Sequence, residues 1–210
     1  MSRAKLNERE KRKKVHITTD KIILKEAKRF FWYCGFDRTT IRDIAKASGC
    51  TPGNIYNHFS SKEEILFRVM LEEMDRVNEK VHLLQQKSSA SSTDQLKAYI
   101  YAFLESMLEP LEEGFMNFEM EIRYLLPHHR KQIIKKRDEH DSLLRTIINR
   151  GIRAGIFAPM NVKIVDFAII ASIVRTRIWY SKRGKLSIKE IANCLSEFFI
   201  QGLLSRSKFS

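Results

Sequence analysis

The sequence predicts an all-α protein of about nine helices, with a small N-terminal domain of three helices and a larger C-terminal helical domain. Apolar residues recur every three or four positions along almost the whole chain, which is the period of a helix with one buried face. Only 8 glycines and 4 prolines interrupt the 210 residues, too few for the turns of an all-β chain. No segment shows the alternation of a strand or the turn of a hairpin.

The first predicted helix ends at a glycine. Its apolar face is formed by residues three or four positions apart: Ile23, Ala27, Phe30, Phe31 and Cys34. Gly35 follows, and a residue without Cβ readily adopts the left-handed backbone that ends many helices. Thr40 and Asp43 then form a capping box, with a hydroxyl at the N-cap and a carboxylate three residues later. A short second helix is therefore expected from residue 41.

A third helix is predicted to begin at Thr51-Pro52, because threonine caps helices and proline is favoured at the first helical position. Gly49 supplies the turn between the second and third helices. Two short helices joined in this way indicate a helix-turn-helix, whose second helix can enter the major groove of DNA. A long fourth helix is expected over residues 61–84.

The C-terminal part shows five further helical patterns, at residues 94–109, 115–126, 129–153, 161–182 and 187–204. Residues 87–93 are rich in serine and are interpreted as a loop. Ser187 and Glu190 form a second capping box, at the start of the last helix. The helix over 161–182 is apolar nearly all round, so it needs cover on both sides.

The charge is concentrated at the N-terminus. The chain has 38 basic and 25 acidic residues, a formal net charge of +13. Residues 1–62 hold 15 of the basic and 6 of the acidic residues, whereas 63–210 hold 23 and 19. This distribution indicates a polyanionic partner, nucleic acid first, although a merely solvated basic face is the alternative. Residues 1–16 are interpreted as a disordered basic arm, residues 17–62 as the helix-turn-helix domain and residues 63–210 as the second domain.

The sequence excludes several other classes of protein. No apolar run reaches the roughly 18 residues of a membrane span, and the charged start lacks the apolar region of a secretory signal. Cys34, Cys50 and Cys194 are odd in number and far apart, which suits a reducing cytoplasm and gives neither a disulfide framework nor a paired-cysteine zinc site. No motif of a metalloprotease, nucleophile elbow or phosphate loop is present, so we expect neither an enzyme nor a cofactor.

A set of N-terminal residues agrees in order and spacing with a known family. These residues are Ile23, Ala27, Phe31, Gly35-Phe36, Thr39-Thr40-Ile41, Asp43-Ile44-Ala45, Gly49, the run from Gly53 to Phe59, and Lys62-Glu63. Over roughly residues 20–70 the chain resembles the DNA-binding domain of TetR/AcrR-type transcriptional regulators; Cys50 stands where that family usually has valine. The resemblance implies a dimeric bacterial regulator in the cytoplasm, bound to the nucleoid at a palindromic operator.

The DNA-contacting residues follow from the helix-turn-helix and from this resemblance. The candidates are Thr40, Arg42, Thr51, Gly53, Asn54, Tyr56, Asn57, His58 and Lys62. Asn54 and Asn57 can both donate and accept hydrogen bonds, so either can read a base. Gly53 allows the backbone to approach DNA, and the resemblance implies phosphate contacts for Tyr56 and His58. The amides that begin the second and fourth helices offer further anion sites, beside Thr40 and Lys62.

The second domain of this family is a helical ligand-binding and dimerisation domain. Candidate ligand contacts are Phe103, Met107, Phe118, Arg123, Tyr124, Arg175, Arg177 and Trp179. Methionine and aromatic residues crowd the middle helices and suit a flexible apolar ligand, although ordinary core packing is the alternative. The arginines need partners, either a ligand carboxylate or phosphate or an intersubunit carboxylate. The run Ile178-Trp179-Tyr180 resembles the branch that regulates lipid, steroid and aromatic catabolism, which commonly senses acyl-CoA thioesters.

The resemblance also implies that the last two long helices pair with their copies in a second subunit. Candidate interface residues are Phe167, Ile170, Val174, Leu195, Phe198 and Phe199. A two-fold dimer would place two reading helices about one DNA turn apart, roughly 34 Å. The resulting hypothesis is a repressor that a small hydrophobic effector releases from DNA.

Three alternatives stay open on the sequence. The effector could be an uncharged or drug-like molecule, as in the control of efflux. A metal sensor could use His128, His129, His140 and Asp141, although their spacing is not that of metal ligands. A non-specific architectural DNA binder would lose affinity evenly across sequences as salt rises.

Overall fold

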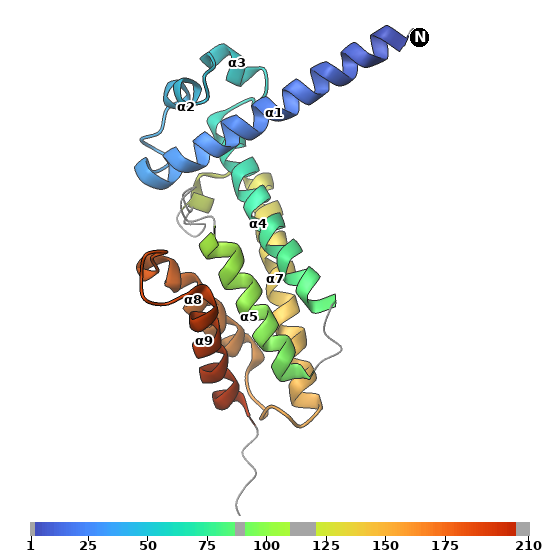
Figure 1. Cartoon of the computed structure of the whole chain (residues 1–210), viewed down its shortest axis with the longest axis vertical. Helices are drawn as coiled ribbons and strands as arrows, with labels where there is room; N and C mark the ends of the chain where they lie inside the picture. Colours follow the sequence, from blue (N-terminus) through green and yellow to red (C-terminus); the bar gives the residue numbers. More distant parts are fainter. Residues whose placement is uncertain (1–2, 87–90, 110–120, 205–210) are drawn as a thin grey trace, which may run out of the picture. The chain divides into compact units, whose positions relative to one another are not determined.

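The structure, a computed structural model, describes residues 3–86, 91–109 and 121–204. These residues are helical, with no β-strand among them, which confirms the predicted fold class (Figure 1). No helix in the described ranges is long and apolar enough to cross a membrane. The chain divides into two compact units: an N-terminal unit of Met1–Glu72 and Glu113–Ile133, and a C-terminal unit of Glu73–Glu112 and Ile134–Ser210.

The N-terminal unit contains α1 (Arg3–Cys34), α2 (Ile41–Ala47), α3 (Pro52–Tyr56), the beginning of α4 (Lys62–Gln86), the short 3-10 helix η2 (Ile122–Tyr124) and the beginning of α7 (Pro127–Arg153). Its core is apolar and draws on all of these elements, with Ile23, Phe31, Ile44, Ile55, Leu66 and Leu125 among its buried side chains. Gly35 and Gly49 have φ values of +81° and +66°, so both turns use the left-handed backbone that favours glycine.

Two expectations about chain organisation differ from the structure. The arm over residues 1–16 was expected to be disordered, but α1 begins at Arg3 and continues through it. Lysine, arginine and glutamate are good helix formers, and the segment contains no glycine or proline to stop the helix. The expected domain boundary at residues 62–63 falls inside α4, and residues from 121 to 133 belong to the N-terminal unit. Of the helix expected at 115–126, residues 115–120 lie outside the described ranges, and η2 occupies part of the rest.

The C-terminal unit is organised around α5 (Ser92–Leu108), which contacts α8 (Val162–Trp179) and α9 (Ile188–Leu203). Leu96, Tyr99, Ile100 and Leu104 of α5 are fully buried. Gly151 of α7 lies against the ring of Phe157, and a Cβ there would come within 2.0 Å of that ring, so this close packing requires glycine. The capping box of Ser187 and Glu190 at the start of α9 is confirmed.

Candidate nucleic-acid interface

The helix-turn-helix predicted from Thr40 to Asn57 is present. The hydroxyl of Thr40 accepts a hydrogen bond from the amide of Asp43 at 3.1 Å, and the Asp43 carboxylate accepts from the amide of Thr40 at 3.0 Å. The Thr40 hydroxyl also donates to the Asp43 carboxylate at 2.6 Å, and this bond, together with the one from the Thr40 amide, lowers the pKa of Asp43. Thr51 caps α3 by accepting from the amide of Asn54 at 3.2 Å. Both short helices are therefore fixed at their N-termini by their own side chains.

Helix α3 is anchored by one residue and exposes the others. Ile55 is completely buried, whereas Tyr56 is 57% exposed and Asn54 and Asn57 are also exposed. The side chains of Tyr56 and Asn57 make no hydrogen bond to any described residue, so their polar atoms are available to a partner. The remaining candidates on this surface, Thr40, Arg42, Thr51 and Gly53, are exposed as well.

Gly53 is not required by the fold. Its φ is not positive, and a Cβ built on it would meet only the hydroxyl oxygen of Thr51, at 3.9 Å. Intramolecular packing thus leaves room for a larger residue at this position. Close approach of DNA to the backbone remains our interpretation of this glycine.

Besides the two capping threonines, His58 and Lys62 also have intramolecular partners. The ring of His58 is nearly buried and contacts the carboxylate of Asp20 on α1. The ammonium of Lys62 donates to the carbonyls of Phe36 and Thr39 at 2.7 and 2.9 Å, and it lies 4.2 Å from the centre of the Phe36 ring. Lys62 therefore ties the start of α4 to the turn between α1 and α2. Sequence spacing gave no signal for this tie, because its partners lie 23 and 26 residues away.

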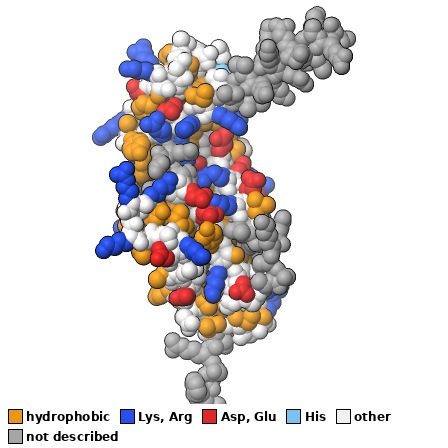
Figure 2. Space-filling model, viewed as in Figure 1, with side chains coloured by type: hydrophobic (Ala, Val, Ile, Leu, Met, Phe, Trp, Pro, Cys, Tyr) orange, Lys and Arg blue, Asp and Glu red, His pale blue; other side chains and the backbone are white. Residues whose placement is uncertain are grey.

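Basic side chains missed by the sequence analysis also lie on the helix-turn-helix. Arg38 is exposed in the turn before Thr39, and Lys46 is exposed in the last turn of α2. On the face shown in Figure 2, Lys and Arg side chains (blue) are more numerous than Asp and Glu side chains (red). Such a surface attracts nucleic-acid phosphates.

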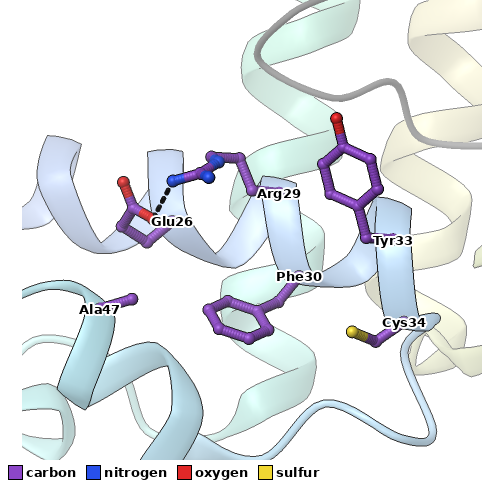
Figure 3. A pocket seen from close by; sticks show the side chains of 6 residues that line it. All are labelled: Glu26, Arg29, Phe30, Tyr33, Cys34 and Ala47. Atoms are coloured by element: carbon purple, nitrogen blue, oxygen red, sulfur yellow. Dashed lines mark hydrogen bonds and ion pairs between the residues drawn. The ribbon is translucent and has the colours of Figure 1, made fainter.

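A small cleft lies between α1 and α2 in the N-terminal unit (Figure 3). It has a volume of about 260 Å³ and is lined by Glu26, Arg29, Phe30, Tyr33, Cys34 and Ala47. Arg29 is paired with Glu26 at 2.8 Å on its rim. The cleft is smaller than the roughly 300–1,000 Å³ of typical ligand pockets, and none of the predicted ligand residues lines it.

The predicted ligand residues are distributed over both units. Phe103 and Met107 are buried on α5 in the C-terminal unit, whereas Arg123 and Tyr124 belong to the N-terminal unit. Phe118 lies outside the described residues. Arg175 and Trp179 are exposed on α8, and the Nε of Arg177 donates to the carbonyl of Val174 at 3.1 Å. The guanidinium groups of Arg175 and Arg177 therefore do not require a buried ligand group as a hydrogen-bond partner. Both residues lie on α8, whose outer side is accessible to solvent.

The predicted dimer residues lie on an accessible apolar surface. Phe167 of α8 is 50% exposed and Phe198 of α9 is 72% exposed, while the other four candidates are half-buried. Ile164 and Ile178, which the sequence analysis did not assign to the interface, are also more than half exposed. Helix α8 is therefore apolar on both sides, with Ile169 and Ile173 buried inside the unit and these residues outside.

The histidines proposed for a metal sensor have other partners. The amide of Asn78 donates to the carbonyl of Lys136, so its oxygen accepts from His140 Nδ1 at 3.0 Å, and His140 Nε2 accepts from the Tyr99 hydroxyl at 2.7 Å. Burial, reinforced by His82, lowers the pKa of His140 to about 4. Among the described residues, no three His, Cys, Asp or Glu side chains are placed to hold a metal ion.

A capped helix-turn-helix with an exposed third helix, joined to a separate helical unit, defines a DNA-binding transcriptional regulator. Comparison with known families agrees. Residues 23–69 match the bacterial regulatory proteins of the tetR family, and residues 89–203 match the tetracyclin repressor-like C-terminal domain. The chain belongs to the tetR family of bacterial transcriptional regulators.

Individual relatives cover most of the chain. It is 26% identical over 162 residues to the transcriptional repressor KstR2 of Mycobacterium tuberculosis, covering 77% of this chain and 78% of that protein. The crystal structure of the regulator PfmR from Thermus thermophilus is 27% identical, with a TM-score of 0.77 over 88% of this chain and 99% of that one. The fold is also that of AibR, solved with isovaleryl coenzyme A and operator DNA, with 20% identity and a TM-score of 0.76 over 89% of this chain and 98% of that one.

Proposed function

We propose that this protein is a homodimeric repressor in the bacterial cytoplasm, which binds a palindromic operator and is released from it by a small hydrophobic effector. The observation that carries the proposal is α3, where buried Ile55 holds exposed Tyr56 and Asn57 beside an exposed glycine. In a two-fold dimer each α3 would read one half-site, and the two half-sites would lie about 34 Å apart. The exposed apolar surface of α8 and α9 supports the dimer.

Release is proposed to be a shift between two populations. The effector would favour a state in which α4 tilts, so that the two copies of α3 no longer match the spacing of the operator. Linkage then requires operator DNA to weaken effector binding by the same factor. Helix α4 suits this role, because its 25 residues run from the N-terminal unit into the C-terminal unit.

Base reading and phosphate binding are separable in the α3 surface. The Asn57→Ala variant should relax sequence preference at one position of each half-site, since a good amide–base pair gives about 1–3 kcal/mol of discrimination. Tyr56→Ala should instead lower affinity for all sequences to a similar extent, because phosphate contacts carry no sequence information. Selection of bound sequences from random DNA, followed by fluorescence anisotropy, measures both effects.

Exposed residues of the same types provide the controls for these two variants. Tyr33→Ala on α1 and Asn149→Ala on α7 remove exposed side chains that the proposal does not place on DNA. Both should behave like the wild-type protein. If the sequence preference of Asn57→Ala is unaltered, Asn57 does not contact a base. If the DNA affinity of Tyr56→Ala is unchanged, Tyr56 does not bind phosphate.

The effector class that we propose is a CoA thioester. AibR, whose fold this chain shares and which was solved with isovaleryl coenzyme A, supports this choice. A ligand at about a hundredfold its Kd should stabilise the protein by about 2.7 kcal/mol, which raises Tm by roughly 5–10 °C in a chain of this size. We expect acyl-CoA thioesters of increasing chain length to show an optimum that free CoA and the free acids lack. If no thioester raises Tm, the effector is not a CoA thioester, and an uncharged hydrophobic effector is favoured.

A further inference from the structure

Residues 121–130 connect the C-terminal family domain to the helix-turn-helix. They fall within the C-terminal family match of 89–203, yet they pack inside the N-terminal unit. Their partners are on the turn after α1 and on the first turns of α4, which fall within the N-terminal match of 23–69. We propose that Tyr124 is a positioning residue for DNA reading, which holds the turn between α1 and α2 and through it the start of α2.

The first step of this connection joins Tyr124 to the turn. Its hydroxyl donates to the carboxylate of Asp37, and its ring centre lies 4.7 Å from that of Phe36. Arg123 donates to the same hydroxyl oxygen at 2.9 Å, which orients the phenol toward Asp37. The contact with Phe36 needs only a ring, whereas the contact with Asp37 needs the hydroxyl. The two contributions of this side chain can therefore be separated by substitution.

The second step joins the turn to α2. Lys62 binds the carbonyls of Phe36 and Thr39 and lies over the Phe36 ring, so Phe36 contacts both Tyr124 and Lys62. Thr39 is buried and immediately precedes Thr40, the N-cap of α2. A displacement of Phe36 would thus shift Lys62 and Thr39, and with them the first backbone amides of α2.

The third step fixes the other end of the segment to α4. A carboxylate oxygen of Glu63 accepts from the amide of Leu126 at 2.8 Å and lies 2.9 Å from His129 Nδ1. The His129 ring stacks on Phe67 with 3.9 Å between centres. The segment that carries Tyr124 is therefore anchored to α4 on its C-terminal side, so the hydrogen bond of Tyr124 can hold the turn in place.

The test is the Tyr124→Phe variant, which keeps the ring and removes the bond to Asp37. Tyr101→Phe is the matched control, because the Tyr101 hydroxyl also donates to a carboxylate, that of Glu105 at 2.9 Å, in the C-terminal unit. We expect Tyr124→Phe to keep the wild-type Tm and to show about tenfold faster amide hydrogen exchange over residues 36–45. Tyr101→Phe should leave exchange in that segment unchanged. Asp37→Ala should reproduce the effect, and adding Tyr124→Phe to it should change nothing further.

DNA binding provides a second readout, and this part rests on the proposed function. Affinity is measured for the selected operator and for the same operator with one base pair inserted between its half-sites. We expect the ratio of the two affinities to fall several-fold in Tyr124→Phe and to be unchanged in Tyr101→Phe. A role in stability alone would lower Tm and leave this ratio intact.

Either of two results would overturn the positioning role: unchanged exchange over residues 36–45, or faster exchange accompanied by an equal loss of global stability. If the wild-type protein selects no operator, the proposed function fails, but the exchange measurement still decides whether Tyr124 positions the turn.

Discussion

Phe198→Asp is expected to give a monomer that no longer holds a palindromic operator. Phe198 is 72% exposed on α9, and the exposed side chains of Phe167 and Ile178 on α8 add to the same kind of apolar surface. An isologous interface would bury two copies of each residue, so the substitution would introduce two unpaired carboxylates into it. Losing the second half-site should weaken operator binding by about 10²–10⁴-fold, since two linked sites bind far more tightly than one.

Sedimentation velocity gives the oligomeric state and fluorescence anisotropy gives the operator affinity. Leu83→Asp is the control, because Leu83 is 53% exposed on α4 and is not assigned to the interface. It should leave a dimer. A Phe198→Asp protein that remains dimeric and binds the operator normally would place the interface on another surface.

Arg145→Ala is expected to destabilise the C-terminal unit strongly at high pH and much less at low pH. Arg145 donates from Nε to the completely buried Asp166 at 2.7 Å and lies 3.6 Å from Asp141, which is also buried. The other oxygen of Asp166 has no hydrogen-bond partner in the described part of the chain. Two buried carboxylates thus share one guanidinium, and its removal leaves both uncompensated. The cost at pH 8 should be about 2 kcal/mol or more.

The pH dependence follows from the direction of the pKa shifts. Burial, with a contribution from Asp166, raises the pKa of Asp141 from 3.8 to about 6, and burial also raises the pKa of Asp166. A raised carboxyl pKa stabilises the fold fully below about pH 3.8, and this stabilisation is lost as the pH rises through 6. Without Arg145 both carboxylates titrate higher still, so the loss of stability should grow from pH 5 to pH 8. Urea unfolding at these two pH values measures it.

A second substitution tests whether buried charge is the cause. Asp141→Asn removes one carboxylate and should stabilise the protein at pH 8 by about 1–2 kcal/mol, because a raised pKa means that the site disfavours the charged form. Asp138→Asn, one turn earlier on α7 and 63% exposed, should change little. If Arg145→Ala costs the same at pH 5 and pH 8, packing of the arginine stem explains the effect and the charge account is wrong.

Local signals in the sequence predicted the elements of the helix-turn-helix well. Thr40 with Asp43, Thr51 before Pro52, and Ser187 with Glu190 all cap the helices that they were expected to begin. Each of these signals depends on residues one to three positions apart, whose geometry the helix itself determines. The buried face of α1 was predictable in part: Ile23, Ala27 and Phe31 are buried as their helical spacing indicates, whereas Phe30 is half-buried and Cys34 is exposed.

Contacts between distant residues were not predictable from one sequence. The intramolecular partners of Lys62 and His58 lie 23–38 residues away and come together only when the chain folds, whereas phosphate contacts for both residues stay a prediction. Tyr124 was grouped with Phe103 as a ligand contact because both are aromatic, whereas folding places them in different units. Asp166 gave no signal either, because one carboxylate in an apolar helix does not reveal which cation on another helix will face it.

Whether two copies of α3 read a palindrome can be measured by selecting bound sequences from random DNA. We expect an enriched inverted repeat whose half-sites are centred about one helical turn apart, roughly 34 Å. Affinity for it should exceed that for unrelated DNA by at least about 10³-fold at physiological salt. Binding that enriches no sequence and declines equally for all DNA as salt rises would contradict the account and indicate a non-specific DNA binder.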